Sequence, residues 1–306
     1  MAALALDGGG VRGLITAAWL EYLDEYTDKP LLDYFDLVAG TSAGSINAVG
    51  LVAGLSGRDV RELFQVNAPE IFPWCLPRWA DKVARIPSQG ISSPKYGSER
   101  LVGAMRNVFG ERPFGDAKIR CLVTTYSMTE SRVLVLDSTN PSHAELPMWK
   151  VVCASSAAPV YFPATHLEIE GVDHVVVDGG VAINAPALTA STALHEATGK
   201  DFKELFLLSL GTGYPITKDK LHELKGAGLW DWGLGLLHFL LSAPSDHTDY
   251  VCRRLHGDNY HRVQVRIPYD EFDIDDATKK NLERLRVTAA SAFSELEPIV
   301  EALESL

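Results

Sequence analysis

The chain has 306 residues, of which 46% are hydrophobic and 22% are charged, the balance of a globular protein with a large core. Its formal net charge of −12 argues against nucleic acid as a partner and against simple electrostatic attraction to an anionic membrane. No linker, repeat or low-complexity run divides the sequence, so we expect one domain over residues 1–306.

Targeting and membrane-spanning patterns are missing from the sequence. No stretch reaches the roughly 18 uncharged apolar residues that a span needs. An apolar strand pattern begins so soon after Met1 that it leaves no room for a signal peptide. The cysteines Cys75, Cys121, Cys153 and Cys252 are widely scattered and lack metal-site spacing. We therefore expect a cytoplasmic protein with reduced thiols and with no metal or cofactor.

Apolar strand patterns alternate with helical patterns along the chain. Strands are predicted near residues 3–7, 35–39, 119–125, 132–137, 173–177, 205–210 and 260–267. Helices are predicted near residues 14–27, 43–55, 58–66, 98–109, 184–198, 229–242, 245–256 and 276–304. This alternation predicts an α/β fold of three layers, α/β/α, with a mostly parallel central sheet.

The first predicted strand runs into a cluster of glycines, A-L-A-L-D-G-G-G-V-R-G over residues 3–13. Consecutive glycines before a helix let several N–H groups point at one anion. The cluster also fits the G-x-G-x-x-G of dinucleotide sites, but such sites want a second strand that ends in an acid about 20 residues later. The next strand ends at Gly40-Thr41-Ser42 instead. An oxyanion hole is therefore favoured over nucleotide binding or a purely structural turn.

Residues 38–44 read V-A-G-T-S-A-G and place Ser42 at a junction between strand and helix. A G-x-S-x-G pattern in this context indicates a nucleophile elbow, a turn so sharp that Gly40 and Gly44 must lack side chains. The pattern predicts that Ser42 is a nucleophile whose hydroxyl stands at the carboxyl end of the strand. A tight turn with an N-capping serine is the alternative interpretation.

Two segments raise the question of access to this site. The stretch 67–97, which contains Trp74 and Trp79, looks irregular and is either a flap over the site or a surface excursion with no gating role. The segment 228–243 is apolar around its whole predicted helix. It is interpreted as a buried core helix, with a surface that faces lipid or a partner as the alternative.

Residues 174–186 read H-V-V-V-D-G-G-V-A-I-N-A-P, a strand that ends in Asp178. Because parallel strands end at one edge of a sheet, Asp178 is expected beside Ser42. Burial would raise the pKa of this carboxyl group and let it accept the serine proton directly. Taken alone, an aspartate that caps a turn is the better interpretation. Asn184 either holds this loop or caps the following helix.

A Ser–His–Asp triad is the mechanistic alternative to a direct Ser–Asp pair. Histidines follow Asp178, so the order of residues along the chain does not exclude a triad. No histidine stands in a strand-end loop beside a glycine or a second acid, and we expect them on the surface or on helices. The histidines considered are His143, His166, His174, His195, His222, His238, His247, His256 and His261.

Together the three motifs resemble those of the patatin-like phospholipases. That family carries D-G-G-G-x-[RK]-G, G-x-S-x-G and D-G-[GA], which are matched here by Asp7–Gly13, Gly40–Gly44 and Asp178–Gly180. Order and spacing agree as well as content, and the resemblance covers nearly the whole chain. Further runs that look like patatin segments lie at residues 155–163 (S-S-A-A-P-V-Y-F-P), 207–213 (L-L-S-L-G-T-G) and 259–264 (N-Y-H-R-V-Q).

The resemblance implies a lipid acyl hydrolase of the phospholipase A or lysophospholipase type, with galactolipids as candidate substrates. It implies a Ser–Asp dyad of Ser42 and Asp178. It also implies an oxyanion hole, assigned to Gly8, Gly9, Gly10, Arg12 and Gly13, with Arg12 bracing the loop. The glycines that would support the elbow and the base loop are Gly40, Gly44, Gly179 and Gly180.

The expected partners are an acyl-lipid substrate and the surface of a membrane or micelle, which the protein would contact peripherally. Nucleic acid is not expected, and a small-molecule activator stays open. A lipid-binding or storage protein that keeps the fold without catalysis is the alternative function. The intact nucleophile and base motifs favour the enzyme, because a decayed enzyme usually loses one of them.

Overall fold

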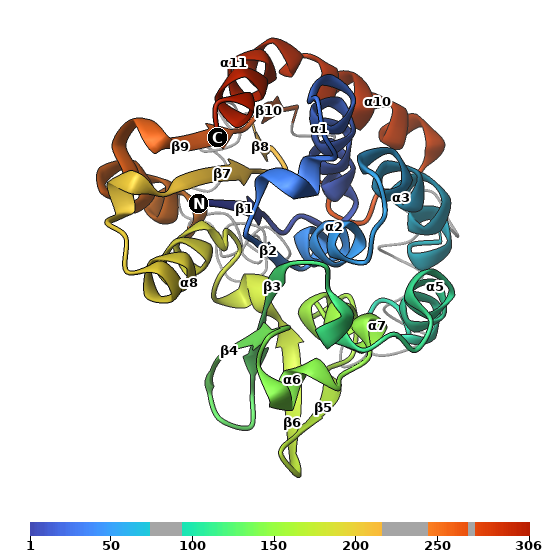
Figure 1. Cartoon of the computed structure of the whole chain (residues 1–306). Helices are drawn as coiled ribbons and strands as arrows, with labels where there is room; N and C mark the ends of the chain where they lie inside the picture. Colours follow the sequence, from blue (N-terminus) through green and yellow to red (C-terminus); the bar gives the residue numbers. More distant parts are fainter. Residues whose placement is uncertain (74–93, 216–243, 269–272) are drawn as a thin grey trace, which may run out of the picture.

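The structure is a computed structural model, shown in Figure 1. It describes residues 1–73, 94–215, 244–268 and 273–306. The predicted helix 229–242, the apolar segment 228–243 and most of the 67–97 stretch lie outside the described residues.

The most apolar strands of the sequence form the centre of the main sheet. β1 (Ala2–Leu6) lies between β2 (Leu37–Thr41) and β7 (Phe206–Leu210), and every residue of these three strands is buried. β3 (Arg120–Ser127) continues the sheet beyond β2, and β9 (Tyr260–Val263) continues it beyond β7. All four pairings are parallel, as expected for apolar strands that are covered on both faces.

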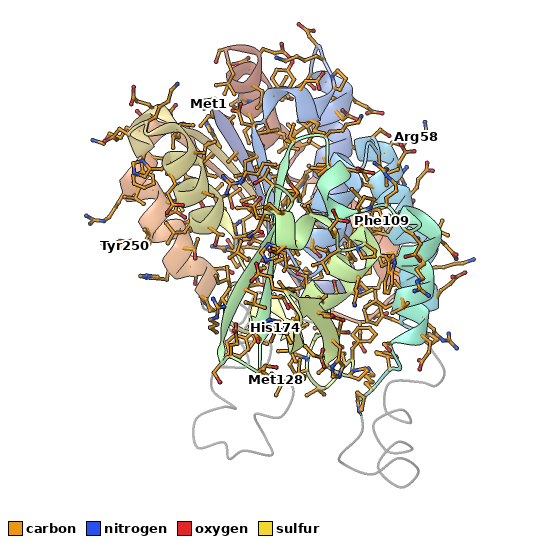
Figure 2. The ribbon with its side chains drawn as sticks, turned by 60° about the horizontal axis from the view of Figure 1, so that its bottom comes forward. Met1, Arg58, Phe109, Met128, His174 and Tyr250 are labelled. Carbon is orange, nitrogen blue, oxygen red and sulfur yellow. The ribbon has the colours of Figure 1, made fainter. Side chains whose placement is uncertain are left out.

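Antiparallel strands complete the sheet on both edges of β3. β4 (Arg132–Asp137) pairs with one edge of β3 over residues 122–127. On the other edge, β2 pairs with the first part of β3, and β6 (Val172–Asp178) pairs with its last three residues. β5 (Thr165–Ile169) completes this part by pairing with β6. Met128 and His174, which belong to this antiparallel part, are labelled near the bottom of the ribbon in Figure 2.

The sequence predicted that parallel strands bring Asp178 beside Ser42, and the topology shows that this part of the prediction is wrong. β6 runs antiparallel to β3 and therefore also antiparallel to β2. The carboxyl ends of β2 and β6 consequently meet head-on along one edge of β3, instead of lying side by side at one edge of a parallel sheet. In the register, Thr41 of β2 stands opposite Thr124. Asp178 of β6 stands opposite the next residue of β3, Thr125.

Alternate residues of β1 point into two cores, one on each face of the sheet. Leu4 belongs to the larger core, and Ala3 and Ala5 belong to the smaller. α8 (Ala187–Thr198) and the helical residues 244–256 cover the smaller core. The predicted α/β/α layers are thereby confirmed (Figure 1). The helices on the larger core are α1 (Gly13–Tyr26), α2 (Ala43–Val52), α3 (Gly57–Ile71), α5 (Glu99–Phe109), α7 (Met148–Ser155), α10 (Lys279–Ala290) and α11 (Phe293–Glu304).

The strand predicted over residues 260–267 is broken into two. β9 stops before Gln264, and β10 (Arg266–Ile267) pairs with β8 (Tyr214–Pro215) in a separate two-stranded sheet. At the break, the side-chain oxygen of Gln264 accepts a hydrogen bond from the Gly213 N–H at 2.6 Å. The break therefore serves to hold the loop that follows β7.

The helix predicted over residues 276–304 is also two helices. The indole N–H of Trp19 donates to the carbonyl oxygen of Ala289 at 2.9 Å. In a continuous helix that carbonyl would accept from the N–H of Phe293, the first residue of α11. Trp19 is fully buried, so its N–H needs this acceptor, which also receives the Ala292 N–H at 3.1 Å in the tight turn where α10 ends.

The turn between β2 and α2 holds Ser42 in a strained conformation, with φ 52° and ψ −123°. A β-carbon at Gly40 would lie 2.4 Å from the Gly44 oxygen, and one at Gly44 would lie 2.1 Å from the Leu6 oxygen. Both glycines are therefore required by the close approach of the backbone. The Ser42 N–H donates to Ser155 Oγ at 2.8 Å, which helps to fix the strained peptide.

The strain at Ser42 predicts an inverted order of stability for two variants that both remove its hydroxyl. Glycine is usually less stabilising than alanine, but it adopts this φ and ψ without the clash of a β-carbon. Ser42→Gly should therefore be more stable to urea than Ser42→Ala, by about 1 kcal/mol. Equilibrium unfolding of the two variants in one buffer checks this, and an alanine variant at least as stable as the glycine variant would contradict it.

Candidate active site

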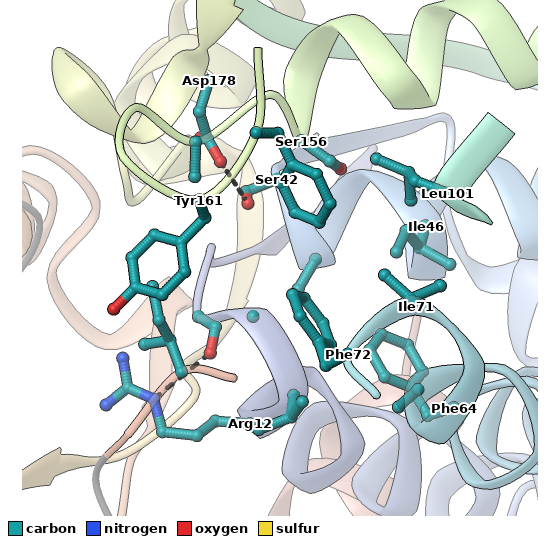
Figure 3. Close-up of a pocket in the computed structure, with 18 of the residues that line it drawn as sticks. Arg12, Ser42, Ile46, Phe64, Ile71, Phe72, Leu101, Ser156, Tyr161 and Asp178 are labelled. Atoms are coloured by element: carbon teal, nitrogen blue, oxygen red, sulfur yellow. Dashed lines mark hydrogen bonds between the residues drawn. The ribbon is translucent and has the colours of Figure 1, made fainter. Parts of the chain in front are cut away.

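Two predicted residues from distant parts of the sequence meet at the carboxyl ends of β2 and β6. Ser42 Oγ donates a hydrogen bond to Asp178 Oδ2 at 2.6 Å, marked by a dashed line in Figure 3. Ser42 is half-buried, whereas only 3% of Asp178 is exposed. The hydroxyl can therefore be reached from a pocket, while the carboxyl group lies behind it.

The second oxygen of Asp178 is held by its own turn. Oδ1 accepts a hydrogen bond from the Gly180 N–H at 2.7 Å. A β-carbon at Gly179 would lie 2.3 Å from the Thr124 oxygen, so only glycine fits between the aspartate and β3. Burial raises the pKa of Asp178 to about 6, although the hydrogen bonds from Ser42 and Gly180 oppose the rise. The carboxylate is ionised at neutral pH and more basic than an exposed aspartate.

The glycine loop after β1 is fixed at both ends through N–H groups. The Gly8 N–H donates to the Asn184 oxygen at 3.0 Å, and the Val11 N–H donates to the Ile274 oxygen at 2.9 Å. Between them, the N–H groups of Gly9 and Gly10 have no acceptor among the described residues. Both glycines line the same pocket as Ser42. Gly8 is thus not a free donor, which corrects the expectation that all three glycines are.

The guanidinium group of Arg12 holds the glycine loop by hydrogen bonds. Its Nε donates to the Gly9 oxygen at 3.2 Å (Figure 3). Its Nη1 donates to the Gly213 oxygen at 3.3 Å. Burial lowers the pKa of Arg12 to about 10, so the guanidinium remains charged at neutral pH. Gly13 was expected in the oxyanion hole, but it is not among the residues that line the pocket. A β-carbon there would collide with the ring of Phe64, so Gly13 serves the packing of α1.

An apolar pocket that is open to solvent lies beside Ser42. Figure 3 shows Ile46, Ile71 and Leu101 to one side of the serine, away from Asp178. Helices α2, α3 and α5 supply much of this wall. The apolar residues that line the pocket are Val11, Ala43, Ile46, Leu63, Phe64, Ala68, Ile71, Phe72, Leu101, Ala158, Tyr161, Phe162 and Ile274.

No histidine among the described residues lines this pocket. His256 forms a Ser–His pair elsewhere, where its Nε2 lies 2.6 Å from Ser191 Oγ and its Nδ1 lies 2.9 Å from the Leu205 oxygen. Both side chains of that pair are at most 2% exposed, which places them in the core below α8. His222 and His238 lie outside the described residues. Within the described stretches, no cluster of three or more His, Cys, Asp or Glu side chains could hold a metal ion.

The sequence motifs predicted no role for two residues that shape the site, Ser155 and Thr212. Ser155 receives the Ser42 N–H and donates to the Thr124 oxygen at 2.7 Å, so it ties the elbow to β3. Thr212 donates to the Gly8 oxygen at 2.7 Å. Both residues fall in runs that look like patatin segments, at 155–163 and 207–213. That resemblance was the available signal, but it gave no function to either hydroxyl.

Comparisons with known proteins agree with the motifs. A family model described as "Patatin-like phospholipase" matches residues 4–191. "Patatin-like protein 2" of Arabidopsis thaliana is 28% identical over 93% of this chain and 81% of its own length. "Patatin-15" of Solanum tuberosum is 26% identical over 92% of this chain and 81% of its own. "Patatin-17" of Solanum cardiophyllum is 28% identical over the same shares.

The chain is also similar to solved structures of bacterial proteins, two of which follow. VipD from Legionella pneumophila matches 95% of this chain and 66% of its own, with 14% identity and a TM-score of 0.42. The ExoU–SpcU complex of Pseudomonas aeruginosa matches 98% of this chain with 16% identity and a TM-score of 0.41. This chain spans 52% of that matched chain, or about half of its length.

In the part of the chain that the structure describes, no helix is both long and apolar enough to cross a bilayer.

The family model spans more than half of the sequence and includes the glycine loop, the serine elbow and the aspartate turn. These motifs form one site in the structure. The chain therefore belongs to the patatin-like phospholipase family, and this membership implies lipid acyl hydrolase activity.

Proposed function

We propose that the protein is a lipid acyl hydrolase of phospholipase A or lysophospholipase type that works through a Ser42–Asp178 dyad. The observation that carries the proposal is the 2.6 Å hydrogen bond from Ser42 Oγ to a buried carboxylate at the wall of an apolar pocket. Strain at Ser42 supports catalysis over simple lipid binding, because a binding protein gains nothing from a serine held in a costly conformation.

In the first half of the reaction, Ser42 Oγ forms a bond to the ester carbonyl carbon while its proton moves to Asp178 Oδ2. The carbonyl oxygen becomes an alkoxide, which the N–H groups of Gly9 and Gly10 are free to stabilise. Collapse of this intermediate breaks the ester C–O bond, and Asp178 returns the proton to the leaving alcohol. Water then repeats the sequence on the acyl-enzyme and releases a fatty acid.

Aspartate is a weak base, and the environment of Asp178 supports its use as one. Its raised pKa lies closer to neutrality than that of an exposed aspartate, yet the group remains ionised near pH 7. The serine lies within hydrogen-bond reach, so the proton transfer needs no histidine as an intermediate. As the proton arrives, the negative charge moves from the buried carboxylate to the alkoxide in front of Gly9 and Gly10.

The pocket supports an acyl chain as the group that enters beside Ser42. Its wall is formed mainly by aliphatic and aromatic side chains from α2, α3 and α5, which suit a hydrocarbon chain. Such a chain must leave a lipid aggregate to enter the pocket, so we propose peripheral contact with a membrane or micelle surface. With a net charge of −12, that contact would depend on apolar side chains more than on attraction to anionic lipid.

Ser42→Ala should lower kcat for a short-chain nitrophenyl ester by about 10⁴-fold or more, because the variant lacks the nucleophile. Asp178→Asn should lower it by about 10²–10⁴-fold, because an amide cannot take the proton. A fluorophosphonate probe should label the wild type at Ser42 and should not label Ser42→Ala.

Ser191→Ala is the matched control, since Ser191 also bonds a potential base but lies buried away from the pocket. It should keep both labelling and turnover. Turnover by Ser42→Ala near the wild-type rate would overturn the dyad, and so would a histidine variant that folds yet loses as much activity as Ser42→Ala.

The pH profile should report the ionisation of Asp178. The base acts only when deprotonated, so kcat/KM should fall as the pH drops below about 6. Carboxyl ionisation has little enthalpy, whereas imidazole ionisation has a large one, so the midpoint should stay in place when the assay is warmed. A midpoint that moves markedly with temperature would indicate a histidine base instead.

A further inference from the structure

We propose that Thr212 is a positioning residue for the oxyanion hole, because its hydroxyl orients the peptide that presents the Gly9 N–H. Thr212 follows β7 and lies about 200 residues from the glycine loop in sequence, yet its Oγ1 donates to the Gly8 oxygen at 2.7 Å. The inference rests on the proposed function, since it concerns how the proposed oxyanion donors are aimed.

The four peptides of the glycine loop are held in two different ways. The two outer ones are fixed by their N–H groups, which belong to Gly8 and Val11. The two inner ones are fixed by their carbonyl oxygens: Thr212 holds the oxygen of Gly8, and Arg12 holds the oxygen of Gly9. Only the inner pair leaves its N–H groups, those of Gly9 and Gly10, without an acceptor among the described residues.

Because a peptide is planar, a hydrogen bond that fixes the carbonyl oxygen of one residue also fixes the direction of the next residue's N–H. In a planar trans peptide, the C=O of one residue and the N–H of the next point in opposite directions. The hydroxyl of Thr212 holds the Gly8 oxygen on one side, so the Gly9 N–H must point to the other. Thr212 is 3% exposed and does not line the pocket, whereas Gly9 does. The anchor is therefore buried, whereas the residue that carries the donor lines the pocket.

The loop that carries Thr212 is itself firmly held. Thr16 Oγ1 donates to the Gly211 oxygen at 2.7 Å, and the Gly213 N–H donates to the side chain of Gln264 at 2.6 Å. The Thr212 side chain also packs on the loop, since a β-carbon at Gly9 would lie 2.3 Å from its Oγ1. Rotating the Gly8–Gly9 peptide would break the hydroxyl bond and press the loop against this side chain.

Thr212→Val keeps the shape of the side chain but removes the hydroxyl, so the Gly8 oxygen loses its donor. We expect kcat to fall by about 10–100-fold with KM nearly unchanged, because a misaimed N–H weakens binding of the transition state more than of the substrate. Inhibition by an alkylboronic acid, which forms a tetrahedral adduct with the serine, should weaken by a similar factor. Thr212→Ser retains the hydroxyl and should restore most of the activity.

Thr198→Val is the control for losing a threonine hydroxyl, because Thr198 Oγ1 donates to the Leu194 oxygen at 2.8 Å at the end of α8, away from the pocket. It should lower the unfolding midpoint slightly, with kcat within about threefold of the wild type. If Thr212→Val does not fold, Thr212→Ser and Thr212→Ala provide the same comparison, since they differ by the hydroxyl alone.

The outcomes separate this inference from the proposed function. If the wild type hydrolyses esters and Thr212→Val, or Thr212→Ala in its place, keeps the wild-type kcat, the inference is overturned and the dyad stands. A loss of kcat equal in the serine and valine variants would also overturn it, since the hydroxyl would then be irrelevant. A wild type that neither turns over esters nor reacts with a fluorophosphonate would overturn the proposed function, and the inference with it.

Discussion

The site depends on one constraint, the head-on meeting of β2 and β6 along a single edge of β3. β3 is long enough to pair with both, and its consecutive residues Thr124 and Thr125 stand opposite Thr41 and Asp178. The hydroxyl groups of Thr41 and Thr124 lie 2.7 Å apart in the core, which fastens the junction. The last residue of β6 is thus placed beside the residue that follows β2, and the Ser–Asp pair follows from strand register rather than from long flexible loops.

The junction between β2 and β6 contains features that lower the stability of the fold, and the surrounding structure keeps them in place. A serine at positive φ and a carboxylate that is almost fully buried both oppose folding. Hydrogen bonds from neighbouring elements hold them: Ser155 receives the N–H of Ser42, and Gly180 donates to the carboxylate. The peptides of the glycine loop are likewise fixed by partners from three separate segments, Asn184, Thr212 and Ile274, together with Arg12 of the loop itself. Strain and buried charge are concentrated where the proposed chemistry needs a reactive hydroxyl and a stronger base.

Much of the fold could be predicted because apolar strands and glycine turns are local signals. The strands β1, β2, β3 and β7 were expected close to their observed positions, as were the elbow and the aspartate turn. The missed features depend on distant contacts. The helix break after α10 lies where the indole of Trp19 binds the Ala289 oxygen, and the role of Gly8 depends on the backbone oxygen of Asn184. The head-on approach of β6 could not be inferred either, because a strand pattern carries no information on direction.

The most direct test of the central claim is the stability of Asp178→Asn as a function of pH. Because burial raises the folded-state pKa of Asp178 from 3.8 to about 6, the wild type should lose about 3 kcal/mol of stability as the pH rises from about 4 to about 6, and the asparagine variant should not. We expect an inactive variant that is more stable than the wild type at pH 8, with an advantage that vanishes near pH 4. A variant that is less stable at pH 8, by an amount independent of pH, would contradict it.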